Sequence, residues 1–236
     1  PDSGVLTSSE LTCTATAEDD DGDTPTIEYS WTNTTTGTTL SSEDTVTLTA
    51  STSSPGDEIA CTATATDAHD GTASDTTSVT LDNTDPVVTD ISISPDEDVV
   101  VGSTLTCSAT ATDDDGGTPT LTYRWTNATE DTSLGLDSTL LLTTSNSSPE
   151  DSIRCTATAT DADGGTDTDA TTVTVDNTDP VIASVSISPS SEVYSNTTLT
   201  CSVDASDADG DTPTASYTWA NESTEETLGT DASLEL

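Results

Sequence analysis

The sequence contains no lysine, methionine or phenylalanine, and its only fixed positive charges are Arg124 and Arg154. Because 45 acidic residues stand against them, the formal net charge is −43. So few cations exclude electrostatic binding of nucleic acid or of an anionic membrane surface. No stretch approaches 18 apolar residues, so we expect no membrane insertion in this segment. A high charge with only 30% hydrophobic residues is also typical of disorder, unless the arrangement of the residues indicates a fold.

An internal repeat indicates such a fold. The segment LTCTATAEDDDGDTPTIEYSWTN begins at Leu11 and returns in similar form at Leu105 and Leu199, each time 94 residues later. A second segment, beginning at Ile59, returns at Ile153. A unit of this length is large enough to be a domain. The predicted domains are residues 1–82 (first strand missing), 83–176 (complete) and 177–236 (last strands missing).

Each unit has the pattern of an all-β domain. Leu105, Cys107, Ala109 and Ala111 alternate with polar residues, which is the pattern of a strand with one buried face. Threonine, being β-branched, suits the solvent face between them. Acidic, Gly-rich and Pro-rich segments that favour turns separate seven such strands in the complete unit. Seven short strands at this spacing predict a Greek-key sandwich, repeated in tandem.

The order Cys107, Trp125, Cys155, repeated as Cys13, Trp31, Cys61, resembles the immunoglobulin fold. The resemblance implies disulfides Cys13–Cys61 and Cys107–Cys155 over a buried tryptophan; the alternative is that all five cysteines are unpaired and buried. A bridge closing such a loop contributes about 3–4 kcal/mol to stability. Disulfides imply an oxidising compartment, so we expect the protein to be extracellular or at a cell surface.

The ends of the chain fall inside predicted domains. Cys201 has no partner here, because its expected mate would follow the last residue, Leu236. The absence of methionine also predicts that the chain does not begin at a translation start. We therefore expect a segment of a longer array. The alternative is that the missing strands come from a neighbouring subunit, as in donor-strand filaments.

Aspartates gather in loops that follow the second and sixth strands and in the linkers Asp-Asn-Thr-Asp-Pro. In an immunoglobulin-like sandwich these loops lie at the end where the chain enters, so we expect them to converge on the linkers. The residues predicted to meet at the first junction are Asp82, Asn83, Asp85, Asp113, Asp115, Asp161 and Asp163. Those at the second are Asp176, Asn177, Asp179, Asp207, Asp209 and Asp211.

Converging carboxylates need a counterion, and Ca²⁺ accepts six to eight such oxygen ligands. The linkers resemble the Asx-rich linkers of cadherins, which implies calcium as a cofactor. The alternative is that the Asp-Gly pairs simply form turns. The Tyr-x-Trp motif and the TATDADG segment also resemble polycystic-kidney-disease-type surface repeats, a resemblance that supports the fold and a surface location.

Five of the seven asparagines begin an Asn-x-Ser/Thr sequence. They are candidate glycosylation sites in a secreted protein: Asn33, Asn127, Asn146, Asn196 and Asn221. Nothing indicates catalysis, because the one histidine, His69, replaces the aspartate of the next repeat and no lysine is present. We therefore expect a protein that is not an enzyme.

The sequence predicts a structural extracellular protein, part of a surface stalk, adhesin or filament. Its expected partners are neighbouring copies of the same repeat or subunit. One alternative is a module that binds a cell-surface glycan or protein. Another is a self-assembling fibre subunit in which donor strands complete the end domains.

Overall fold

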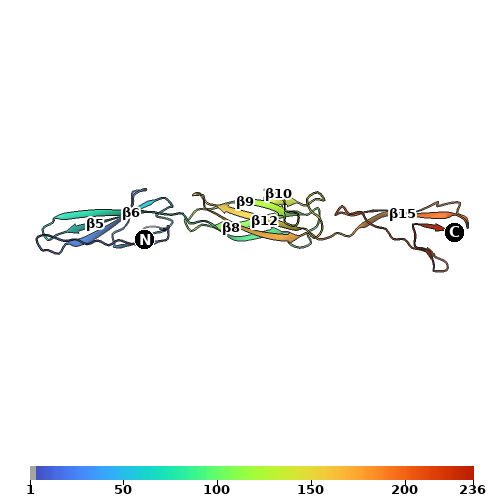
Figure 1. Cartoon of the computed structure of the whole chain (residues 1–236), viewed down its shortest axis with the longest axis horizontal. Helices are drawn as coiled ribbons and strands as arrows, with labels where there is room; N and C mark the ends of the chain where they lie inside the picture. The colour runs from blue at the N-terminus through green and yellow to red at the C-terminus, as the bar shows by residue number, and fades with distance from the viewer. Residues whose placement is uncertain (1–3) are drawn as a thin grey trace. The chain divides into compact units, whose positions relative to one another are not determined.

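The computed structural model describes residues 4–236, and within that range it contains strands and no helix (Figure 1). This confirms the all-β prediction, and no helix that could cross a membrane occurs in the described residues. The first strands are β1 Glu10–Thr12, β2 Thr26–Asn33, β3 Thr38–Ser41, β4 Thr45–Thr47, β5 Glu58–Thr66 and β6 Thr72–Thr80. The next are β7 Val87–Ser94, β8 Thr104–Thr112, β9 Thr120–Asn127, β10 Thr132–Gly135, β11 Thr139–Leu141, β12 Ser152–Thr160 and β13 Thr166–Thr174. The last are β14 Val181–Ser188, β15 Thr198–Ser206, β16 Trp219–Asn221, β17 Glu226–Gly229 and β18 Ser233–Glu235.

Strands β7 to β13 form one seven-stranded immunoglobulin-like sandwich. One sheet has the order β10-β9-β12-β13 and the other β11-β8-β7. The fourth strand, β10, pairs with the third, whereas in antibody constant domains it joins the opposite sheet. The strand positions agree with the seven predicted from the sequence, because each apolar alternation has one face to bury.

The chain divides into two compact units that share the strands of this sandwich. Unit 1 contains the described residues up to Ser92, together with 108–123 and 156–171. Unit 2 contains residues 93–107, 124–155 and 172–236. The residues predicted to meet at the first junction therefore belong to unit 1, and those predicted to meet at the second junction belong to unit 2.

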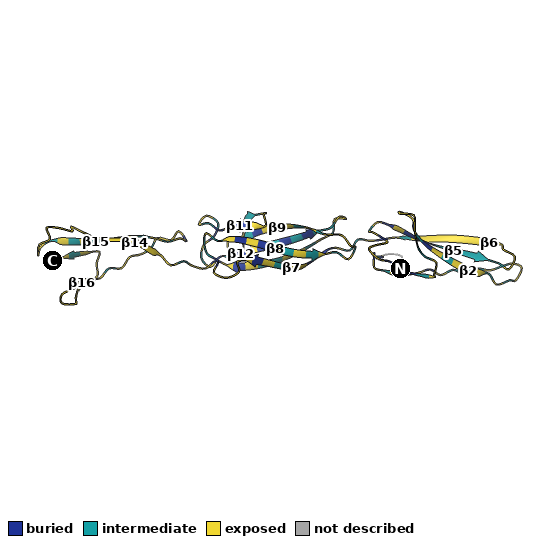
Figure 2. Cartoon of the chain, turned by 180° about the vertical axis from the view of Figure 1, so that it is seen from behind, coloured by how far each residue is buried: buried dark blue, intermediate teal, exposed yellow. Residues whose placement is uncertain are grey.

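The core of unit 1 is built by strands β1 to β6 and the segment before them. Sheet β3-β2-β5-β6 places Trp31 opposite Cys61, and the pair β1-β4 places Leu11 opposite Val46. Buried residues here are Val5, Leu11, Cys13, Trp31, Val46, Leu48, Ile59, Cys61 and Leu81. The outer strand β6 is exposed along most of its length (Figure 2).

In unit 2 the core residues of the sandwich are similarly apolar. They are Val99, Leu105, Cys107, Trp125, Leu140, Leu142, Ile153, Cys155 and Val175. The indole Nε1 of Trp125 donates to the carbonyl of Asp137 at 2.9 Å, so this large buried side chain leaves no polar atom unsatisfied. Strand β14, by contrast, is exposed at every residue (Figure 2).

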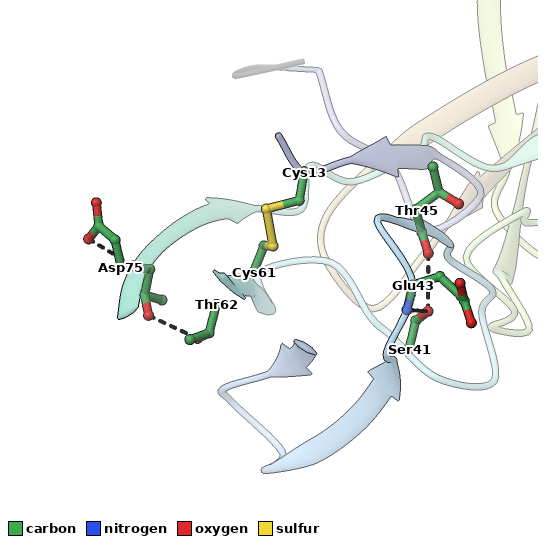
Figure 3. The surroundings of a disulfide bond; sticks show 8 residues. Cys13, Ser41, Glu43, Thr45, Cys61, Thr62 and Asp75 are labelled. Atoms are coloured by element: carbon green, nitrogen blue, oxygen red, sulfur yellow. Dashed lines mark hydrogen bonds between the residues drawn. A yellow bond between two sulfur atoms is a disulfide. The ribbon is translucent and has the colours of Figure 1, made fainter. Parts of the chain in front are cut away.

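Both predicted disulfides are present. Cys13 is joined to Cys61 and Cys107 to Cys155, and each pair lies 48 residues apart in the sequence. Figure 3 shows the first bridge beside the turn at Glu43, where the hydroxyl of Ser41 accepts from the Glu43 amide. Cys201 is free and half-buried.

The three copies of the LTC segment do not form equal strands, although the sequence predicts the same strand in each. Residues 104–112 form β8, and residues 198–206 form β15. In the first copy only Glu10–Thr12 is a strand, and Cys13–Asp19 is not. The reason is that β8 and β15 pair with β7 and β14, whereas no strand in residues 4–236 pairs with Cys13–Asp19.

Candidate functional site

The first aspartate of each acidic loop stabilises its own turn. The Oδ1 atom of Asp113 accepts from the Asp115 amide at 2.8 Å, and that of Asp161 accepts from the Asp163 amide at 2.9 Å. Asp207 accepts from the Asp209 amide in the same way. An aspartate that bonds the amide two residues later is a known turn former. At these three residues one carboxylate oxygen therefore already serves the loop, as the turn alternative predicts.

The carboxylate of Asp115 is held by residues that lie far from it in the sequence. Its Oδ2 accepts from the amide of Thr84 in the first linker at 2.7 Å. Its Oδ1 accepts from the hydroxyl of Thr7 at 2.6 Å, and the Thr7 residue is 1% exposed. The loop after β8 is thus bonded both to the linker and to the segment before β1.

A second contact joins the same linker to the loop after β12. The Nδ2 of Asn83 donates to Oδ2 of Asp161 at 3.0 Å. This bond, aided by the amides of the loop, holds the pKa of the Asp161 carboxyl below its ordinary value. A Cβ atom on Gly165 would lie 2.5 Å from Oδ1 of Asp85 and 2.7 Å from Nδ2 of Asn83, so only glycine fits where these groups gather.

The geometry brings together only part of the first predicted cluster. Asn83, Asp85 and Asp161 surround Gly165, while Asp113 and Asp115 lie in the loop bonded to Thr84. Asp82 instead accepts from the Gly4 amide at 3.1 Å, and Asp163 is exposed. Among residues 4–236, no group of three or more His, Cys, Asp or Glu side chains is arranged to hold a metal ion.

The second linker repeats one of the two contacts. Thr178 donates to Oδ2 of Asp209 from its amide at 2.7 Å and from its hydroxyl at 2.8 Å. Asn177 bonds only the carbonyl of the next residue, and the rest of this predicted cluster is not brought together. Those remaining residues are the exposed Asp176, Asp179 and Asp211 and the turn-forming Asp207.

Two buried oxygens at these linkers have no hydrogen-bond partner. They are Oδ1 of Asn83 and Oδ1 of Asp209. For Asp209 the missing donor can be identified by comparing the repeats. Thr7 donates to Oδ1 of Asp115, but Val101, which occupies the equivalent position beside Asp209, has no hydroxyl. Asp209 is nevertheless only 7% exposed. Burial of an unsatisfied polar atom is costly, so each oxygen is a position where a bound cation would add stability.

Two of the candidate glycosylation sites, Asn33 and Asn127, are buried, with exposures of 0% and 2%. Their Nδ2 atoms donate at 2.7 Å to the buried carboxylates of Asp57 and Asp151. A glycan attached to Nδ2 would need the space that these contacts fill. Both asparagines therefore stabilise the folded sandwich instead.

The other three sequons differ in accessibility. Asn146 is half-buried, and its side chain bonds the Thr143 amide and the Leu141 carbonyl. Asn196 and Asn221 are exposed, so glycosylation remains a prediction that their surroundings allow.

Three residues with structural roles, Thr7, Asp57 and Asp151, are not among the residues predicted from the sequence. A signal for the two aspartates was present, since Asn33 and Asp57 are 24 residues apart, and so are Asn127 and Asp151. No such signal existed for Thr7, because its equivalent in the next repeat is Val101.

No protein-family model matches the chain, and neither does any curated protein. Several solved structures of tandem β-modules are similar to it. Immunoglobulin domains 1–5 of Sidekick-1 are 18% identical with a TM-score of 0.37, and the match covers 96% of this chain and 46% of that one. A tetra-tandem repeat from the extending region of a large adhesion protein is 17% identical with a TM-score of 0.32, covering 100% and 63%. Fibronectin(III)-like modules of Clostridium thermocellum CbhA are 17% identical with a TM-score of 0.28, covering 73% and 88%. The chain thus spans less than two thirds of the first two structures.

Proposed function

We propose that this chain is part of an extracellular structural repeat protein, a stalk, adhesin or filament, and that it is not an enzyme. In this proposal its domains are residues 1–82, 83–176 and 177–236. Their function is mechanical: bridged sandwiches resist unfolding, and linkers bonded to acidic loops limit bending between neighbouring domains. The partners are neighbouring copies of the same repeat.

The observation that carries the proposal is the set of contacts at the first linker. Thr84 bonds Asp115 in one loop, Asn83 bonds Asp161 in another, and Asp115 also accepts from Thr7 of the preceding domain, 1–82. A linker that only tethered two domains would need none of these contacts, since few contacts cross a flexible domain boundary. The two disulfides support an oxidising, extracellular location.

Force spectroscopy on the full chain tests the mechanical role. Tension should pass through the Cys107–Cys155 bridge. While the bridge is intact, the 48 residues that it spans therefore bear no force and do not extend. We expect the double variant Cys107→Ala/Cys155→Ala to extend by about 160 Å more than the parent chain, from about 3.4 Å per residue. A parent chain that extends without any resolved unfolding event would refute a mechanical role. In the source organism, an antibody against the chain should label unpermeabilised cells.

Calcium is the cofactor that suits these linkers. Oδ1 of Asn83 is buried without a partner, and Oδ1 of Asp85 lies near the same glycine as the Asp161 carboxylate. All are hard oxygen atoms of the kind that Ca²⁺ prefers. Protein cations offer little compensation: within the described residues the one ion pair joins His69 to Asp23 at 3.5 Å. Asn83, Asp85 and Asp161 would hold the ion at the first linker, and Asp209 would contribute at the second.

Calorimetric titration with Ca²⁺ tests this part of the proposal. At 100 times the dissociation constant, binding stabilises the folded state by about 2.7 kcal/mol, which corresponds to a rise in melting temperature of about 10–20 °C. Asn83→Ala and Asp161→Asn should abolish the rise in the first junction. Asp114→Asn is the matched control, because it removes an exposed charge from the loop after β8, which contributes none of the residues assigned to the ion at the first linker. A heat of binding that is absent, or that is unchanged in Asn83→Ala and Asp161→Asn, rules out calcium at Asn83.

A further inference from the structure

The only two arginines of the chain lie on the same sheet of the middle sandwich. Arg124 is on β9 and Arg154 on β12, which are neighbours in the sheet β10-β9-β12-β13. Both arginines are exposed, whereas the residues that follow them, Trp125 and Cys155, are fully buried. Because successive side chains of a strand point to opposite faces, both arginines point away from the core. We call this outward surface the arginine face.

The first repeat gives the register of these two strands. There Trp31 lies opposite Cys61, so by the repeat Trp125 lies opposite Cys155. Each arginine directly precedes one member of this second pair, which makes the two arginines diagonal neighbours on adjacent antiparallel strands. Diagonal neighbours are about 7–8 Å apart, a separation that long side chains can span. The two guanidinium groups can therefore act on one partner surface.

No acidic side chain of the described residues compensates these two charges. The one ion pair within residues 4–236 joins a histidine to an aspartate. Two residues before each arginine, the next outward positions of the strands carry the uncharged Thr122 and Ser152. In the first repeat the same two positions carry Glu28 and Glu58. In a chain with a net charge of −43, the fixed positive charges thus share one surface and have no partner there.

The equivalent surface of the first repeat has the opposite sign. Glu28 on β2 and Glu58 on β5 are exposed, and uncharged residues replace the two arginines. The Glu58 carboxylate accepts from the hydroxyl of Ser78 at 2.7 Å and from that of Thr34 at 3.0 Å. These two bonds hold the pKa of the Glu58 carboxyl below its ordinary value, so the group stays ionised. We call this outward surface of the sheet β3-β2-β5-β6 the glutamate face.

An exposed leucine accompanies the arginines. Leu136 directly follows β10, whose last residue, Gly135, lies opposite Trp125. The side chain of Leu136 is 73% exposed, and the other two repeats have Ser42 and Thr230 at this position. Arginine is enriched in protein–protein interfaces, and covering an apolar side chain adds to the free energy of association. The middle repeat therefore combines two features of a docking surface that the other repeats lack.

We propose that the arginine face of the middle repeat binds the glutamate face of the first repeat in a second copy of the chain. Complementary charge selects this partner, because it brings Arg124 and Arg154 against Glu28 and Glu58 while two copies of either face would repel. The contact joins two different surfaces, so each copy keeps one face free for the next copy and the assembly can extend. The inference rests on the proposed function, in which neighbouring copies are the partners.

Sedimentation velocity of the full chain at about 1 M salt tests the contact, because the Debye length there is about 3 Å and long-range repulsion between acidic chains is screened. We expect the parent chain to self-associate and Arg124→Gln/Arg154→Gln to raise the dissociation constant at least about tenfold. Thr106→Glu/Ser108→Glu is the matched control, since it makes the same change in net charge at exposed positions of β8, in the other sheet. A parent chain that stays monomeric, or an arginine variant that associates like the parent, overturns the proposal.

Exchanging the charges identifies the partner face. Glu28→Arg/Glu58→Arg and Arg124→Glu/Arg154→Glu should each fail to self-associate, since each variant has two faces of the same sign. Mixing the two variants should restore association, because their faces are again complementary. A mixture of folded variants that stays monomeric contradicts the assigned pairing.

An acidic glycan is the competing ligand for two neighbouring arginines, and polygalacturonate serves as its probe. Binding of polygalacturonate by a monomeric parent chain, with loss of that binding in Arg124→Gln/Arg154→Gln, would assign the arginines to a glycan and overturn the contact between copies. Force spectroscopy on a single chain does not depend on this contact. A failure of association therefore leaves the mechanical test of the proposed function unaffected.

Discussion

Removing the disulfide between Cys107 and Cys155 is expected to lower the unfolding free energy of the middle sandwich by about 3–4 kcal/mol. The bridge closes a loop over 48 residues, and its loss restores the conformational entropy of that loop to the unfolded chain. The loss matters for this sandwich because its core contains no phenylalanine and includes the small side chains of Ala157 and Ala159. Marginal hydrophobic burial leaves a greater share of the stability to the bridge.

Urea unfolding of Cys107→Ala/Cys155→Ala measures this loss. Replacing Trp31 and Trp219 with Phe in both proteins leaves Trp125 as the fluorescent reporter of the sandwich. Cys201→Ala is the control, since it removes a thiol that forms no bridge and should change the unfolding free energy by less than about 0.5 kcal/mol. A double variant as stable as its parent would show that the bridge does not stabilise the fold.

Replacing Asn127 with alanine is expected to destabilise the same sandwich by about 3 kcal/mol. Its Nδ2 donates at 2.7 Å to the carboxylate of Asp151, a residue that is 6% exposed. Without that donor, a buried carboxylate keeps only the bond from the Ser148 amide. Losing a hydrogen bond to a charged group costs about 1.5–3 kcal/mol, and the poorly compensated buried charge adds to this.

The repeat supplies a matched control for this substitution. Asn221 stands at the same position of the motif, yet it is exposed, and its side-chain bonds stay within its own turn. Asn221→Ala should therefore change the unfolding free energy by about 0.5 kcal/mol or less. Asp151→Ala and the double variant complete a double-mutant cycle, in which a coupling energy near zero would contradict the interaction.

Much of the fold could be predicted because it depends on local sequence patterns. Alternation around Leu105 and Cys107 marks a strand wherever it occurs, and the order Cys107, Trp125, Cys155 identifies the sheets that face each other. The resemblance of that order to the immunoglobulin fold implies both disulfides, and both are present. The acidic loops were also correctly placed as turns, since Asp113 and Asp161 bond amides only two residues away.

The contacts of the site could not be predicted equally well, because they depend on groups brought together from distant positions. Asp115 receives bonds from Thr84 and from Thr7, and the second of these is missing where Val101 replaces the threonine. Of the first cluster, only Asn83, Asp85 and Asp161 gather at Gly165. Composition shows that carboxylates are abundant, but not which of them face one another.

By itself the sequence determined that the chain is a tandem array of bridged β-sandwiches, because side-chain alternation and cysteine order are properties of the chain alone. The tertiary structure decided what identical motifs become. Asp115 and Asp209 stand at the same position of the repeat, and each accepts from the threonine amide of its linker. Only Asp115 also accepts from the hydroxyl of Thr7, because Val101 stands in the place of Thr7 in the next repeat and leaves Oδ1 of Asp209 without a partner. Such contacts join residues that are distant in sequence, so a repeated motif makes the same contacts only where its neighbours repeat as well.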